Sequence, residues 1–295
     1  MAGRVFIGVS GWRYTPWRGH FYPKGLAQSR ELEYASRQFH TLELNGSFYS
    51  LQRPSSYAAW ARATPPGFIF AVKGSRYITH MLKLRNIETA LANFLASGLF
   101  ELGDKLGPIL WQFAPQMRFH ADLFDEFLAR LPKTANAAAK IARGRDARVR
   151  DRESLVPDRN RRMRHAVEVR HESFVDAAFI RMLRRHGVAW VVADTPNSWP
   201  LFEDVTADFV YVRLHGSTEL YNSRYSPEEI AYWARCIRAW ARGGQPRGAR
   251  LISKEKPRER ASRDVYCYFD NTDKRCAPEN ARELMARTER DITSC

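Results

Sequence analysis

The feature that most limits how this chain can fold is a regular alternation of two kinds of segment. Eight short runs rich in β-branched and aromatic residues each lead into turn residues and then into a segment with helix-like spacing of apolar positions. Continuous apolar runs of this length are typical of parallel strands that are buried on both faces. The predicted strands cover residues 5–10, 41–46, 68–74, 108–113, 166–171, 188–194, 209–215 and 265–271.

The intervening segments predict helices, two of which begin with capping signals at Asn86 and Ser226. Eight strands that alternate with helices, without a shift in composition, favour one α/β domain over residues 1–295, a single (β/α)8 TIM barrel. The main alternative is an open doubly wound sheet, but no glycine-rich dinucleotide motif follows any strand. The predicted helices cover residues 31–39, 55–63, 87–102, 121–131, 173–186, 227–242 and 278–288, and the break at residues 131–132 allows one more over 133–143.

Composition narrows the class of protein. With 44% hydrophobic residues the chain can build a large core, and it contains no apolar run near the roughly 18 residues that a membrane span requires. The start of the chain lacks the long apolar stretch of a secretion signal, so we expect a cytoplasmic protein that does not enter a membrane. Cys236, Cys267, Cys276 and Cys295 show no metal-site or disulfide spacing, so we expect reduced thiols, with Cys267 packed in a strand.

The net charge of +15 is the largest anomaly in the composition. Much of it comes from two long basic insertions between predicted strands, over residues 140–164 and 247–263. Because both precede strands, we expect them on the N-terminal face of the barrel, opposite the usual active site. One interpretation is that they are solvated loops, and the other is that they bind nucleic acid.

The ends of the predicted strands hold carboxylates, amides, imidazoles and cations. TIM barrels carry their chemistry at the C-terminal ends of strands, and residues two apart in a strand point to the same side. A charge that points into a barrel needs a partner or a substrate, so we predict a polar mouth with a function. The strand-end residues are Glu43, Asn45, Lys73, Gln112, Glu168, Arg170, His171, Asp194, Arg213, His215, Asp270 and Asn271.

Two chemistries are compatible with such a mouth. Carboxylates and imidazoles suit a divalent metal, for which Glu43, Glu168, Asp194 and His215 are the candidate ligands. The cations in the same mouth oppose a metal and suit a phosphate or carboxylate, which arginine binds through paired hydrogen bonds. We therefore expect a small anionic substrate and no cofactor, with Glu168 or Asp194 as general base and His215 or His171 as proton donor or acceptor.

Aromatic segments follow the first two strands, and Trp12 and Tyr49 lie in them. Aromatic rings near basic residues can stack on bases or sugars, and the alternative is a packed lid over the barrel end. His80 follows the third strand in a similar segment. We expect these three residues to contact substrate together with the strand-end residues Glu43, Asn45, Lys73, Gln112, Arg170, Arg213 and Asn271.

Eight blocks of the sequence together resemble a known family. The blocks are GVSGW at 8–12, ELNGSFY at 43–49, FAVKGSRYITH at 70–80, GPILWQF at 107–113, EVRHESF at 168–174, AD at 193–194, YVRLHG at 211–216 and VYCYFDNT at 265–272. Their order is similar to that of domain-of-unknown-function family 72, the YecE-like proteins, over nearly the whole chain. The resemblance implies a TIM barrel, and its motif positions fall on the strand-end residues above, but it implies no particular reaction.

Two functions from different classes follow from these observations. The first is an enzyme, a hydrolase or lyase, that uses acid–base chemistry on a phosphate-bearing or otherwise anionic substrate at the mouth. The alternative is a non-catalytic protein that binds nucleic acid through the basic insertions 140–164 and 247–263, with the strand-end groups stabilising the barrel. Sugar isomerisation would rest on analogy of fold alone.

Overall fold

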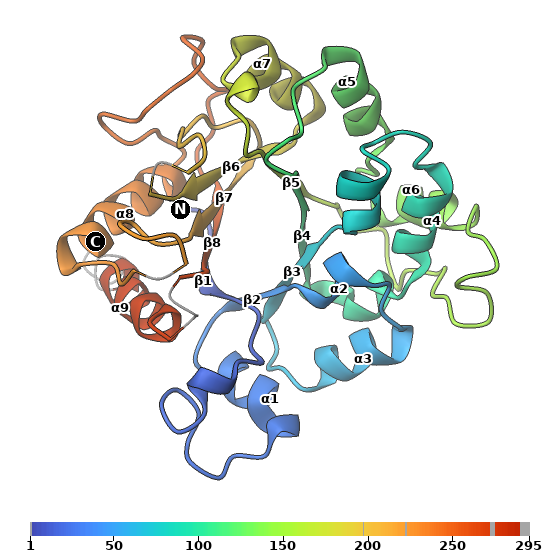
Figure 1. The fold of residues 1–295 in the computed structure, drawn as a ribbon, viewed down its shortest axis with the longest axis horizontal. Helices are drawn as coiled ribbons and strands as arrows, with labels where there is room; N and C mark the ends of the chain where they lie inside the picture. The colour runs from blue at the N-terminus through green and yellow to red at the C-terminus, as the bar shows by residue number, and fades with distance from the viewer. Residues whose placement is uncertain (1, 197, 222, 272–274, 290–295) are drawn as a thin grey trace.

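The computed structural model describes residues 2–196, 198–221, 223–271 and 275–289. Eight parallel strands close into a barrel, each paired with its neighbours in chain order, and β8 pairs with β1 (Figure 1). This confirms the predicted TIM barrel. The strands are β1 Val5–Ser10, β2 Thr41–Leu44, β3 Ile69–Lys73, β4 Leu106–Gln112, β5 His165–Glu168, β6 Ala189–Asp194, β7 Phe209–Leu214 and β8 Asp264–Phe269.

Helices surround the barrel (Figure 1). The α-helices are α1 Glu31–Ser36, α2 Gly46–Tyr49, α3 Pro54–Arg62, α4 Glu88–Ala96, α5 Ala121–Arg130, α6 Ala135–Ala142, α7 Ala177–His186, α8 Pro227–Ala241 and α9 Ala277–Glu289. Shorter helical turns are η1 Thr15–Trp17, η2 Gln28–Arg30, η3 Tyr77–Met81, η4 Leu99–Lys105 and η5 Glu172–Phe174. Among the described residues, no helix combines the length and the apolarity needed to cross a bilayer.

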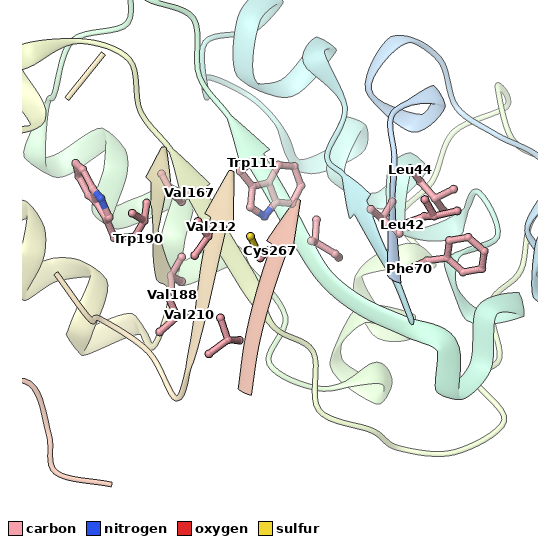
Figure 2. Close-up of a cluster of buried hydrophobic side chains, with 14 of the residues drawn as sticks. Leu42, Leu44, Phe70, Trp111, Val167, Val188, Trp190, Val210, Val212 and Cys267 are labelled. Carbon is pink, nitrogen blue, oxygen red and sulfur yellow. The ribbon is translucent and has the colours of Figure 1, made fainter. Parts of the chain in front are cut away.

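Strand side chains divide between two cores. Those that point into the barrel form one cluster, in which the rings of Phe6 and Tyr266 stack with their centroids 4.8 Å apart. Two residues further along the strands, the rings of Tyr211 and Tyr268 pack with centroids 5.1 Å apart. Outward-facing side chains such as Trp111 pack with the helices in a second, larger cluster (Figure 2). The mouth is the next layer above the tyrosines.

Several predicted strands are shorter than expected, and two of these differences affect the mouth. The strand predicted over 41–46 ends at Leu44, because Gly46 already begins the short helix α2. The strand predicted over 166–171 ends at Glu168, since the chain turns into η5 within the next few residues. Asn45, Arg170 and His171 therefore follow strands instead of lying in them.

The helix predicted over 87–102 is divided. Gly98 has a φ of 123° and ends α4, and η4 continues the chain in a new direction. A side chain at position 98 would lie 2.6 Å from the Cα atom of Pro54, so the close approach of α3 also requires glycine there. The helix predicted over 173–186 begins only at Ala177, after Asp176 accepts a hydrogen bond from the Ala178 amide.

The two predicted capping signals have different outcomes. Ser226 and Glu229 form a reciprocal capping box at the start of α8, as expected. The prediction for Asn86 is wrong, because Asn86 has a φ of 49° and lies one residue before the N-cap Ile87, whose side chain makes no capping bond. The optional helix over 133–143 forms as α6, capped by the Thr134 hydroxyl.

The three cysteines that the structure describes are reduced thiols, as expected. Cys267 lies in β8 and is buried, as predicted, and Cys236 is buried in α8. Cys276 is partly exposed. Cys295 and the last residue of the sequence block 265–272 lie outside the described residues.

Several arginines of the basic insertions bind acidic side chains of the same chain. In the first insertion, Arg145 pairs with Glu153 at 2.5 Å, and Arg161 pairs with Asp158 at 2.6 Å. Arg159 also binds an acid, Asp104. The first insertion is therefore a self-neutralised loop over much of its length, not a continuous row of available cations.

Candidate active site

Arg213 occupies the centre of the mouth because of the alternation along β7. Val210, Val212 and Leu214 pack outward in the larger core, so the side chains between them point into the barrel. The side chain of Arg213 is completely buried. Its guanidinium lies above Tyr211, at the level where the apolar filling of the barrel ends.

Three carboxylates surround the Arg213 guanidinium. Glu43 binds it in a bidentate manner, with Nε to Oε2 at 3.1 Å and Nη2 to Oε1 at 2.9 Å. Glu168 Oε2 accepts from Nη1 at 2.6 Å, and Asp270 Oδ2 accepts from Nη2 at 2.9 Å. Burial alone would lower the pKa of Arg213, but Glu168, Glu43 and Asp270 hold it well above its usual value. Arg213 is thus a permanent cation whose donors are directed to protein groups.

Glu168 is the most heavily hydrogen-bonded carboxylate of the mouth. Its Oε1 accepts from Gln112 Nε2 at 2.8 Å, and from Nε and Nη2 of Arg170 at 2.9 and 2.8 Å. Burial opposes its ionisation, but the charges of Arg213 and Arg170 outweigh burial and hold its pKa well below the usual value. A carboxylate that is so stable in its ionised form is a weak base. Glu168 is therefore better suited to positioning cations than to proton abstraction.

Lys73 is the least strongly bound charge of the mouth. Its Nζ donates to Gln112 Oε1 at 3.3 Å and lies 4.7 Å from the centre of the Phe48 ring. Burial and the nearby Arg213 charge lower the pKa of Lys73 to about 8, although Glu43 and Glu168 act in the opposite direction. The charges of the mouth balance when Lys73 is protonated, since the ionised groups are then Glu43, Glu168 and Asp270 against Lys73, Arg170 and Arg213.

His215 lies beneath two aromatic side chains. Its ring makes edge contacts with Trp199 and Tyr221, at centroid distances of 5.3 and 5.4 Å, and the side chain is fully buried. Nε2 lies 3.2 Å from Arg213 Nη1. Because a guanidinium only donates hydrogen bonds, Nε2 accepts and the proton is assigned to Nδ1, 3.5 Å from Asp270 Oδ2.

The rim of the mouth holds polar groups that are directed toward its opening. Asn45 Nδ2 donates to Ser10 Oγ at 2.9 Å, and its buried Oδ1 has no hydrogen-bond partner within the described residues. His80 lies edge-on to Phe48 at 5.2 Å, the ring that Lys73 also contacts. Burial and then the charges of Arg170, Lys73 and Arg76 lower the pKa of His80, so its imidazole is neutral at neutral pH.

The two aromatic residues expected to contact substrate differ in exposure. Tyr49 is 64% exposed, and Arg76 lies 5.2 Å from the centre of its ring. Trp12 is partly buried and packs edge-on to Trp60 of α3 at 5.8 Å. Tyr49 is therefore available to a ligand, whereas Trp12 serves at least in part as a packing residue.

Three predicted site residues do not join the cluster. Asp194 follows Ala193, which faces into the barrel, so its own side chain turns outward to Tyr225 and Trp233, and burial raises its pKa. Asn271 is also at a position whose side chain points out of the barrel, and its Nδ2 donates to the Ser223 carbonyl at 2.9 Å. His171 Nδ1 accepts from the Ser173 amide at 3.0 Å and so caps η5.

The metal-ligand set considered from the sequence does not converge. Asp194 turns away from Glu43 and Glu168, and those two carboxylates bind the Arg213 guanidinium. Within the described ranges, no group of three His, Cys, Asp or Glu side chains is arranged to hold a metal ion.

Sequence reasoning missed several members of the site. Asp270 is not among the residues predicted to act at the site, but it lies two residues after the inward-facing Tyr268 and binds Arg213. Tyr211 donates to Glu43 Oε2 at 2.7 Å, and Ser10 donates to Glu43 Oε1 at 2.7 Å. The alternation along β7 and β1 could have identified both. Trp199 comes from the long β6–β7 loop, where no local pattern indicates position.

The fold and the site define a class of protein: a TIM barrel with a buried, charge-balanced polar cluster at the C-terminal ends of its strands. The chain belongs to the family described as "Protein of unknown function DUF72", which matches residues 6–294. The resemblance seen in the sequence blocks is thereby confirmed.

Solved structures of the same family share the fold. A DUF72 family protein of Thermotoga maritima MSB8 is 25% identical and superposes with a TM-score of 0.71, covering 97% of this chain and 99% of that chain. A DUF72 family protein of Enterococcus faecalis V583 is 18% identical with a TM-score of 0.66, covering 97% and 95%. UPF0759 protein YunF of Bacillus subtilis (strain 168) is 32% identical over 75 residues, which are 25% of this chain and 26% of YunF.

Proposed function

We propose that this protein is an enzyme, a hydrolase or lyase, that acts on a phosphate-bearing or other anionic substrate at the mouth of the barrel. The observation that carries the proposal is the state of Lys73. It is a buried amine with one weak hydrogen bond, beside carboxylates that are already bound to Arg213. A lysine in a purely structural ion-pair cluster would instead bind a carboxylate directly.

The protonation state of Lys73 supports a role in proton transfer. With a pKa of about 8, about a tenth of the molecules carry the neutral amine at pH 7. A group whose pKa lies near the working pH is an efficient general acid or base. His80 supplies a neutral imidazole next to the same Phe48 ring. Lys73 and His80 therefore resemble an acid and a base whose surroundings give them different pKa values.

An anionic group of the substrate has cations to bind at the same place. The Arg170 guanidinium lies 3.7 Å from the centre of the Trp199 ring, which fixes its plane. Its Nε and Nη2 bind Glu168, and Nη1 makes no hydrogen bond within the described part of the chain. Arg76 on the rim adds a second guanidinium, which is exposed. Hydrolysis of a phosphate ester and elimination of an anionic leaving group both use such an arrangement.

The proposed roles of the other candidates follow from their contacts. Glu43, Glu168 and Asp270 hold Arg213 and set the field around Lys73, while Gln112 orients the Lys73 amine. Asn45 offers an acceptor to a substrate hydroxyl or amide. Because His215 is covered by Trp199 and Tyr221, it is proposed to position Arg213 and Asp270 unless those rings move.

The test separates anion binding from proton transfer at one position. A panel of phosphate monoesters and carboxylated substrates is screened with the purified chain, and the best substrate is then used with variants. Lys73→Arg keeps a cation but has a pKa too high to release a proton, so we expect kcat to fall about 100-fold or more with KM nearly unchanged. Lys73→Met also removes the cation and should both lower kcat and raise KM. Arg170→Met should mainly raise KM.

Arg37→Met is the matched control, because Arg37 forms only an exposed ion pair with Glu33. The pH profile of kcat/KM should show an ionisation near pH 8 that is lost in Lys73→Arg. If Lys73→Arg retains full kcat on every substrate turned over by the native chain, Lys73 does not transfer the proton and the proposal fails. It also fails if no member of the panel is converted or bound.

A further inference from the structure

A second cavity lies at the opposite end of the barrel from the proposed active site. It has a volume of about 490 Å³ and is lined by residues that precede β5, β7 and β8, together with the C-terminal end of α7. Both basic insertions contribute to its wall. We call it the basal cavity, and its cations include Lys133, Arg162, Arg164, Arg258, Arg260 and Arg263.

The cations of the basal cavity fall into two groups. Arg162 and Arg164 bind Asp208, and Arg164 also binds Asp264 at 2.7 Å. The α7 arginines that line the cavity likewise have acidic partners outside it. Within the described residues, the remaining four form no ion pair with a carboxylate. These are Lys133, Arg258, Arg260 and Arg263.

Arg263 is the decisive member of the second group. Its side chain belongs to a residue that is only 2% exposed, yet it contacts carbonyl oxygens and no carboxylate of the described chain. Nη1 donates to the Gly243 and Gly244 carbonyls, and Nη2 donates to the Arg258 carbonyl at 2.8 Å. Its buried Nε has no hydrogen-bond partner within the described residues.

Burying a cation without a counter-charge costs free energy, and it lowers the pKa of two cations of the cavity. Burial, with a smaller contribution from the Arg260 charge, lowers the pKa of Arg263. Burial and the Arg162 charge also lower the pKa of Lys133. Proteins normally pair such cations with an anionic group, which is a carboxylate of the chain or a bound anion. The carbonyls hold the Arg263 side chain in the wall of the cavity, where its positive charge has no carboxylate partner in the described chain.

We propose that the basal cavity binds a small oligophosphate, either free or as part of an organic phosphate. The volume suits a small ligand, and planar guanidinium groups bind phosphate oxygens in pairs. An extended nucleic acid strand would need a continuous row of cations, whereas the first insertion binds its own acids through Arg145, Arg159 and Arg161. The proposal is independent of the reaction at the mouth.

The experiment measures binding to the full chain by isothermal titration calorimetry, with inorganic triphosphate as the probe. Arg258 and Arg260 are exposed, so their side chains can be changed without disturbing the core. We expect the double variant Arg258→Gln with Arg260→Gln to bind triphosphate at least tenfold more weakly. The matched control, Arg247→Gln with Lys254→Gln, removes the same charge from exposed positions of the same insertion that do not line the cavity, and should bind normally.

Further measurements distinguish the basal cavity from the mouth, from a general effect of charge and from a nucleic acid surface. Lys73→Met should leave unchanged the triphosphate binding that is lost in the Arg258, Arg260 variant, whereas a loss there with normal binding by the Arg258, Arg260 variant would place the anion at the mouth and overturn the proposal. Equal weakening in both double variants would indicate a general charge effect and also overturn it. Tighter binding of a single-stranded oligonucleotide that depends on Arg247 and Lys254 would show a nucleic acid surface instead. Absence of triphosphate binding to the native chain would refute it directly.

Discussion

Arg213 is the residue on which the order of the mouth most depends. One guanidinium binds three carboxylates that project from β2, β5 and the end of β8. Without it, Glu43, Glu168 and Asp270 would share a buried space with only Lys73 and Arg170 as nearby cations. The cost of breaking such a buried cluster exceeds the value of any single ion pair on the surface.

Arg213→Met should therefore be strongly destabilising. We expect the free energy of unfolding to fall by about 3–5 kcal/mol, as for other buried ion pairs from which one partner is removed. Urea unfolding followed by tryptophan fluorescence measures the change. Arg37→Met, at an exposed ion pair, should change the free energy by less than about 1 kcal/mol. A loss at Arg213 no larger than at Arg37 would contradict the central role of this residue.

The low pKa of Glu168 makes the free energy of unfolding depend on pH. Its pKa in the folded protein lies well below that of an unfolded glutamate, so its contribution is fully present above about pH 4.3. The contribution is lost as the pH falls through the folded pKa, because the unfolded chain then binds the proton more readily. Glu168→Gln should be less stable than the native chain at pH 7, and this difference should shrink by pH 3. A constant difference across urea unfolding curves at pH 7, 5 and 3 would refute this.

At the scale of elements, Gly98 decides where α4 ends. Its φ of 123° and the nearby Pro54 of α3 turn one predicted helix into two differently directed segments. Gly67 makes a matched comparison, because it has a φ of 78° but would place a side chain in open space. The two positions separate backbone strain from a steric clash.

Gly98→Ala should be more destabilising than Gly67→Ala. Both substitutions impose strain of about 1 kcal/mol from the left-handed backbone, and only the first adds a clash with Pro54 and Tyr57. We expect the midpoint of thermal unfolding to fall further for Gly98→Ala, by several degrees beyond the shift for Gly67→Ala. Equal shifts would show that α3 adjusts freely to a side chain at this position.

At the scale of the whole molecule, the barrel separates two charged regions. Lys73 ends β3 at the mouth, whereas Arg260 precedes β8 at the base, so the two lie about a strand's length, roughly 20 Å, apart. The mouth is charge-balanced by its own carboxylates, and the basal cavity has cations that the described chain does not balance. We therefore expect the two proposed sites to act independently.

Substitutions at the two ends should therefore be additive. The change in unfolding free energy for Lys73→Met combined with Arg260→Gln should equal the sum of the single changes within about 0.5 kcal/mol. Chemical denaturation of the two single variants and the double variant provides the measurement. A larger interaction energy would mean that the barrel core couples its two ends.

The sequence by itself determined the strands, their closure into a TIM barrel and most of the mouth. The alternation of apolar runs with helices is a local signal, and residues at strand ends meet wherever parallel strands close a barrel. Local signals failed where a neighbour from another element intervened, as with Gly98 beside α3. They also failed for Asp194 and Asn271, because alternation along β6 and beyond β8 turns these two polar side chains away from the interior of the barrel.

Only the tertiary structure decided which charges of the chain are satisfied. The sequence shows Glu43, Glu168 and Arg213 far apart, and their pairing arises because the barrel brings β2, β5 and β7 around one axis. The same holds for the basic insertions, whose arginines look alike in sequence. Folding pairs Arg145 with an acid and buries Arg263 among carbonyls, because the path of the folded chain decides which neighbours each arginine meets.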